Sequence, residues 1–60
     1  MKEKRFVAFD MPIEEALEKM AYMDTVKVLD KTTALVEGFS VFVDGLIEKG
    51  FRLGTKVEEM

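Results

Sequence analysis

The side chains of this chain offer few ways to do chemistry. It contains no cysteine and no histidine, so disulfides and the usual thiolate and imidazole metal ligands are absent. The soft ligands that remain are the thioethers of Met11, Met20 and Met23. Met20 falls on the apolar stripe of an expected helix, and methionine commonly fills gaps in small cores. We therefore expect packing at these positions, with no metal and no cofactor.

The carboxylates are equally poor candidates for catalysis. Glu14, Glu15 and Glu18 share the solvated face of one expected helix, Asp44 falls on the outer side of another, and residues 58–59 belong to the tail. None has a neighbouring nucleophile or base in the pattern that general acid–base chemistry needs. The sequence predicts a protein that is not an enzyme, with no catalytic residue.

Composition indicates one small domain spanning residues 1–60. A chain of this length buries a small share of its surface, and 48% of its residues are hydrophobic. A second copy is therefore the expected source of further burial. Nine Lys and Arg oppose twelve Asp and Glu, a net charge of −3, which argues against a nucleic-acid partner.

The N-terminal pattern bears on location. Basic residues precede a short apolar run that stops at Asp10, and no long apolar segment follows. This pattern predicts no signal peptide, no membrane span and a cytoplasmic protein. The Glu/Lys-rich composition with few Asn and Gln is typical of thermophiles.

The clearest element is a helix that begins at Ser40, whose hydroxyl could cap it, and ends before Gly50, in a position that favours a left-handed residue. Phe51 is placed to fold back onto it. Its predicted buried face has the i, i+3, i+4, i+7, i+8 spacing and consists of Phe39, Phe42, Val43, Leu46 and Ile47.

A second helix start combines Asp10 as the cap, Pro12 in the first turn and acidic residues after it. This helix is expected to end near Met23 and Asp24. Its predicted buried face consists of Ile13, Ala16, Leu17, Met20 and Ala21.

Four segments have the composition of strands: 4–9, 25–29, 33–38 and 51–57, with Gly54 as a bulge or close approach. The first has apolar residues on both faces, which predicts a central strand. A shift of thirty residues aligns Asp10 with Ser40 and Lys19 with Lys49. The pattern predicts an α+β fold, the ferredoxin-like β-α-β-β-α-β two-layer sandwich.

Two alternatives stay open. Residues 33–49 fit one long helix in a β-α-β-α-β order, although Gly38, Gly45 and the β-branched residues disfavour it. Asp44-Gly45 also fits a hairpin turn.

Three segments resemble heavy-metal-associated domains and copper chaperones. Met11-Pro12-Ile13-Glu14-Glu15-Ala16 resembles their metal loop, in which Met precedes Thr-Cys-x-x-Cys. Leu46-Ile47-Glu48-Lys49-Gly50-Phe51 is similar to the end of their second helix, and Val26 to Val28 with Val36 resembles their central hairpin. The resemblance implies the same sandwich. It does not imply metal transfer, because apolar Ile13 and Ala16 occupy both cysteine positions.

The apolar excess leads to the functional prediction. If two helices cover one sheet face, some apolar residues must lie on the open face and on the outer side of the second helix. We expect a non-enzymatic protein-interaction domain that forms a homodimer through its open sheet face or an edge strand. The predicted interface residues are Phe6, Ala8, Val36 and Val41. Val36 represents the pair Leu35 and Val36, of which one must lie on the open face.

The alternative is a regulatory or carrier module. It would bind a small ligand between protomers or at the helix starts, where Asp10 and Ser40 are expected to lie side by side.

Overall fold

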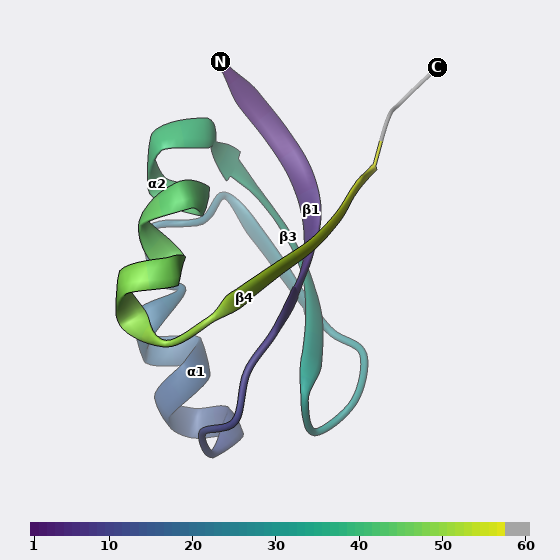
Figure 1. Cartoon of the computed structure of the whole chain (residues 1–60), viewed down its shortest axis with the longest axis vertical. Helices are drawn as coiled ribbons and strands as arrows, with labels where there is room; N and C mark the ends of the chain where they lie inside the picture. Colours follow the sequence, from purple (N-terminus) through teal and green to yellow (C-terminus); the bar gives the residue numbers. More distant parts are fainter. Residues whose placement is uncertain (58–60) are drawn as a thin grey trace.

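A computed structural model describes residues 1–57, so Glu58 and Glu59 lie outside the described residues. The chain forms β1 (Lys2–Ala8), α1 (Ile13–Lys19), β2 (Thr25–Val28), β3 (Thr33–Phe39), α2 (Ser40–Gly45), the short 3₁₀ helix η1 (Leu46–Lys49) and β4 (Arg52–Val57). The predicted element order is confirmed. The protein is a ferredoxin-like two-layer α+β sandwich, with both helices on one side of the sheet (Figure 1).

The four strands form one antiparallel sheet in the order β2-β3-β1-β4. As predicted, β1 is central. Residues 33–38 belong to strand β3, which excludes the long helix over 33–49, and Asp44-Gly45 lies inside α2, which excludes the hairpin turn. The β-branched and aromatic residues of β3 fit a pleated, half-buried surface better than a helix.

The register of β1 against β3 decides which side chains enter the core. Val7 lies opposite Ala34, and Phe6 lies opposite Leu35. Because directly opposite residues share a face, Val7 and Ala34 face the helices and Phe6 and Leu35 face away. The core consists of Val7, Phe9, Ala16, Met20, Ala34, Val36, Val43, Leu46 and Phe51.

Both helix starts differ from the prediction. The N-cap positions are Pro12 and Phe39, and neither helix has a side-chain cap. Asp10 instead accepts a hydrogen bond from Arg52 Nη1 (2.9 Å), and the Ser40 N–H donates to the Met1 carbonyl (2.8 Å).

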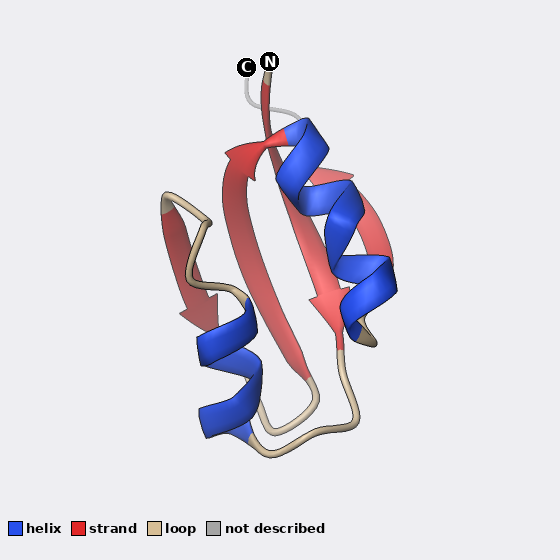
Figure 2. Ribbon diagram, turned by 90° about the vertical axis from the view of Figure 1, so that its left-hand side faces the viewer, coloured by secondary structure: helices blue, strands red, loops and turns tan. Residues whose placement is uncertain are grey.

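Asp10 and Ser40 therefore lie at opposite ends of β1, not side by side. β1 and β3 are antiparallel, so the helices that follow them start at opposite ends of the sheet (Figure 2). A shared ligand site at the two helix starts is excluded.

The end of the second helical segment, at Gly50, agrees with the prediction. Gly50 has a φ of 102°, and the Phe51 N–H donates to the Leu46 carbonyl (3.0 Å). Phe51 then packs on Phe9, with ring centroids 5.7 Å apart. Lys19 Nζ donates to the Lys49 carbonyl and Lys49 Nζ to the Lys19 carbonyl, both at 3.4 Å. These two lysines are the pair aligned by the thirty-residue shift.

The helices are shorter than expected, and their apolar faces are only partly buried. α1 ends at Lys19, and residues 20–24 form turns rather than helix. Because α1 and α2 do not pack along their lengths, the sides of their apolar stripes stay in solvent. The predicted buried residues that prove exposed are Leu17, Ala21, Phe39, Phe42 and Ile47.

Candidate interaction surfaces

One group of exposed apolar side chains gathers from the turn after α1, the end of β3 and the first turn of α2. We call Tyr22, Phe39, Val41 and Phe42 the aromatic cluster. The Tyr22 and Phe42 rings stack, with centroids 5.8 Å apart and an interplanar angle of 29°. Phe39 meets Phe42 edge to face at 6.2 Å. These side chains keep between 45% and 71% of their surface exposed, which is unusual for contiguous aromatic residues.

Two lysines lie against these rings. Lys49 Nζ is 5.2 Å from the centroid of Tyr22, and Lys2 Nζ is 5.3 Å from that of Phe39. Lys2 also forms an ion pair of 2.6 Å with Asp24. The hydrogen bond to Asp24 raises the pKa of Lys2 above its ordinary value, and the Coulombic attraction adds to it. The cluster is thus bordered by charges of both signs.

A groove of about 260 Å³ runs beside the cluster, between the end of α1 and α2. Tyr22, Val41 and Phe42 form its apolar part, and Lys19 and Lys49 also line it. Its floor comes from elements that are distant in sequence, so only the folded chain creates it.

The open sheet face carries the apolar side chains of Phe6, Ala8 and Leu35, and Leu35 is the member of the pair Leu35 and Val36 that faces outward. Phe6 is 37% exposed, and its neighbours Ala8 and Leu35 are half-buried. The prediction that Val36 is an interface residue is wrong, because Val36 is 0% exposed and faces the helices opposite Arg5. Leu35 takes the position on the open face. Val41 lies exposed on α2, as expected for the outer side of that helix.

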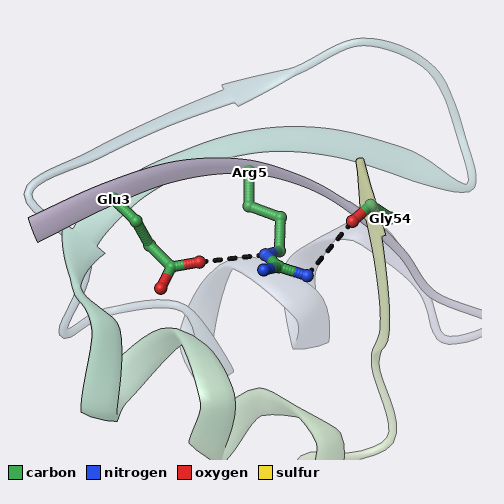
Figure 3. Close-up of polar contacts among 3 residues, drawn as sticks. All are labelled: Glu3, Arg5 and Gly54. Carbon is green, nitrogen blue, oxygen red and sulfur yellow. Dashed lines mark hydrogen bonds and ion pairs between the residues drawn. The ribbon is translucent and has the colours of Figure 1, made fainter. Parts of the chain in front are cut away.

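A charged group is enclosed at the end of the helix-facing side. The Glu3 side chain is 5% exposed and accepts a hydrogen bond from Arg5 Nε (2.9 Å). Arg5 Nη1 donates to the Gly54 carbonyl (3.2 Å), which ties β1 to the irregular part of β4 (Figure 3). The Ser40 hydroxyl, and next to it Arg5, hold the pKa of Glu3 below its ordinary value. These contacts link the edge strand β4, through the central strand β1, to Ser40 at the start of α2.

Gly54 lies where the pairing of β1 with β4 shifts register. A Cβ at this position would be 3.1 Å from the Phe6 carbonyl oxygen. The predicted close backbone approach is confirmed, and this irregularity re-aims the strand.

Other features bear on metal binding and membranes. Within residues 1–57, no three His, Cys, Asp or Glu side chains come together in a way that could hold a metal ion. Ile13 opens α1 and Ala16 is buried, at the positions where the resembled family carries cysteines. No helix in the described part of the chain is long and apolar enough to span a membrane.

Sequence reasoning missed the aromatic cluster. It placed Phe39 and Phe42 on a buried stripe and gave Tyr22 no role. The available signal was the number of large apolar residues, which exceeds what nine core positions can hold.

Comparison with known proteins adds no relative. No protein-family model matches the chain, and neither curated proteins nor solved structures match it significantly. The resemblance to heavy-metal-associated domains is therefore supported for the fold and not for membership of that family.

Proposed function

We propose that the chain is a small non-enzymatic protein-interaction domain that self-associates as a symmetric homodimer through the aromatic cluster. The observation that carries this proposal is the exposure of Tyr22, Phe39 and Phe42 in one contiguous group. Their size is informative: at about 200 Å² per fully exposed aromatic side chain, the three rings offer roughly 300 Å². The largest apolar patch on a typical monomeric protein measures about 300–600 Å² and is often functional.

The whole interface must be larger than the rings. A stable interface takes about 800 Å² from each partner, which is close to a fifth of the 4186 Å² surface of this chain. Val41 and the groove beside it extend the rings toward that area. Aromatic anchors surrounded by a polar rim are the usual anatomy of such a surface.

The charges at the rim favour a second copy as the partner. In a two-fold interface the same patch meets itself, so it must be complementary to itself. Lys2 and Lys49 border the rings, and Asp24 and Glu48 lie close to them. A rim with both signs allows lysines of one copy to approach acids of the other, which a rim of a single sign would not.

Light scattering coupled to size exclusion, over a dilution series, tests the proposal. The wild type is expected to show a dimer that dissociates on dilution. Replacing Tyr22 and Phe42 together by Ser should give a monomer at every concentration, because the stacked pair is lost. Ile47→Ser is the matched control, since Ile47 is 57% exposed but contributes nothing to the cluster. The proposal is overturned if the wild type is a monomer at every concentration. It is also overturned if Ile47→Ser is a monomer while the double variant of Tyr22 and Phe42 stays a dimer.

The open sheet face is the competing surface for the same function. Phe6→Glu places a charge at its centre, where Phe6 is 37% exposed. The aromatic-cluster dimer is expected to keep its mass in this variant. If Phe6→Glu alone produces a monomer, the sheet face is the interface.

The groove favours one second candidate, a carrier or regulatory module for small ligands. Its lining joins aromatic rings to Lys19 and Lys49, a combination suited to aromatic carboxylates. A thermal-shift series with benzoate, phenylacetate and indole-3-acetate tests it. A rise in melting temperature with ligand concentration that Phe42→Ser abolishes supports this candidate, and no rise removes it.

A further inference from the structure

We infer that β2 is a docking edge for an extended peptide strand of a partner protein, one that carries an acidic residue between two apolar ones. The sheet order leaves two edges, β2 and β4. β4 is interrupted by the irregularity at Gly54, which hinders a further strand. β2 pairs with β3 in regular register from Thr25 to Val28 and stands at the outer edge in Figure 2.

The hydrogen bonds of β2 identify its unused backbone groups. The Leu29 N–H donates to the Thr33 carbonyl (3.0 Å), so these two residues form a hydrogen-bonded pair of the antiparallel ladder. Such pairs alternate along the strand. Thr25 and Lys27 therefore also face β3 with their backbone groups. The N–H and C=O groups of Val26 and Val28 point away from the sheet, ready to pair with an added strand.

The side chains of β2 set the chemistry of that strand. Val26 and Val28 lie opposite Val36 and Ala34, on the helix-facing side, and Val28 is still 37% exposed. A docked strand should therefore place apolar residues beside them. Lys27 is exposed on the open face opposite Leu35.

Charge then selects the central residue of the docked strand. An acid opposite Lys27 is favourable, whereas a like charge directly opposite destabilises the pair. Thr25 is paired with Glu37 of β3 on its other side. A second acid close to Glu37 would be repelled, so a small polar residue suits the place opposite Thr25 on the docked strand. The expected motif opposite residues 25–28 therefore alternates polar, apolar, acidic, apolar.

The same pattern disfavours a second copy of this chain at β2. The strand reads Thr-Val-Lys-Val, and pairing two antiparallel copies about Lys27 would oppose the two ammonium groups. The docking edge is thus distinct from the aromatic cluster, and each can be tested without the other.

The probe is the capped peptide acetyl-Thr-Val-Glu-Val-Thr-amide. It reads the same in both directions, so it presents the motif to a parallel or an antiparallel edge alike. Titrated into ¹⁵N-labelled protein, it should shift the amide resonances of Val26 and Val28 and slow their hydrogen exchange. The amides of Thr55 and Lys56 on β4 are the internal control and should stay unchanged.

Two further peptides separate the contributions of pattern and charge. Acetyl-Val-Thr-Glu-Thr-Val-amide has the same composition with the apolar positions inverted, and should bind at least threefold more weakly. Acetyl-Thr-Val-Lys-Val-Thr-amide imitates β2 of a second copy, and should also bind at least threefold more weakly. If either peptide binds as tightly as the first, or if the shifts fall on β4, the inference is wrong.

Two protein variants complete the test. Lys27→Glu should weaken binding of the Glu-containing peptide roughly threefold to tenfold and strengthen binding of the Lys-containing peptide by a similar factor, as expected for a cross-strand charge pair. Lys31→Glu is the matched control, because Lys31 lies outside β2. Val28→Pro should abolish binding, because it removes an outward N–H that the ladder does not use. Equal peptide affinity in wild type and Lys27→Glu overturns the role of charge, and unchanged binding by folded Val28→Pro overturns the edge itself. Both variants should keep the self-association of the wild type, which reports separately on the aromatic cluster.

Discussion

Removing Arg5 should destabilise the fold through the partner that it leaves behind. The Glu3 side chain is 5% exposed and that of Arg5 is 24% exposed, and a 2.9 Å hydrogen bond joins them. In Arg5→Met the aliphatic stem is largely retained while the guanidinium is lost. Glu3 then keeps the Ser40 hydroxyl as a donor but has lost its closest cation.

The magnitude follows from this geometry. Removing one member of a buried ion pair costs about 3–5 kcal/mol, because the remaining charge stays desolvated. Arg5 is partly exposed and Ser40 remains, so we expect the free energy of unfolding to fall by about 2–3 kcal/mol, the upper range for a charged hydrogen bond. For a domain of this size, each kcal/mol lowers the melting temperature by about 4–8 °C.

Thermal and urea unfolding followed by circular dichroism measures the change. The decisive comparison is the double variant Glu3→Met with Arg5→Met, in which no charge is left unpaired. Replacing both members of a buried pair by apolar residues is often close to neutral, so the double variant should unfold within about 1 kcal/mol of the wild type. A double variant as unstable as Arg5→Met would refute this reasoning and assign the cost to the lost Arg5 contact with the Gly54 carbonyl.

Three further predictions concern stability. The pKa of Glu3 is lower in the folded protein than its ordinary value, so its ionised carboxylate contributes fully to stability above the ordinary glutamate pKa of about 4.3 and loses that contribution as pH falls through the folded pKa. Glu3→Gln should therefore flatten the acid limb of a plot of the free energy of unfolding against pH. An unchanged acid limb contradicts this. Gly50→Ala should lower the free energy of unfolding by about 1 kcal/mol, because the φ of Gly50 is 102°. Gly45→Ala should raise it by up to about 1 kcal/mol, since Gly45 is helical and a Cβ there meets nothing within 4 Å. Equal melting temperatures for the two variants would exclude this account. Phe51→Ala should cost about 3–5 kcal/mol, enough to unfold so small a domain, because Phe51 is 2% exposed against Phe9; a cooperative melt near that of the wild type would show that the core collapses around the cavity.

Local signals in the sequence determined much of the fold. The apolar residues on both faces of β1 and the glycine that closes the second helix are signals between near neighbours, and the predictions from both are confirmed. The thirty-residue shift is confirmed only in part, since Lys19 and Lys49 do lie together but Asp10 and Ser40 are not the helix caps. The helix caps failed as predictions although Asp10 and Ser40 have suitable side chains. Arg52 is 42 residues from Asp10 along the chain and donates a hydrogen bond of 2.9 Å to its carboxylate, a contact that no local pattern predicts.

Candidate surfaces were harder to predict, because exposure is a property of packing. Periodicity placed Phe39 and Phe42 on the apolar stripe of a helix. Phe42 does lie on α2, whereas Phe39 ends β3 and takes the N-cap position of α2. Whether a stripe is covered depends on how far the neighbouring helix reaches, and here the two helices do not pack along their lengths. The same limit explains Val36: choosing between Leu35 and Val36 requires the register of β3, and a shift of one residue exchanges the two faces.

The sequence by itself determined the order of the elements, the central place of β1, the left-handed closure at Gly50 and an excess of apolar residues over the capacity of one small core. Tertiary structure alone decided where that excess lies. Pairing β1 with β3 sends Val36 inward and Leu35 outward, and the short antiparallel helices leave Tyr22, Phe39 and Phe42 together in solvent. The physical reason is that hydrogen bonds and periodicity act between near neighbours, whereas burial depends on which distant segments meet.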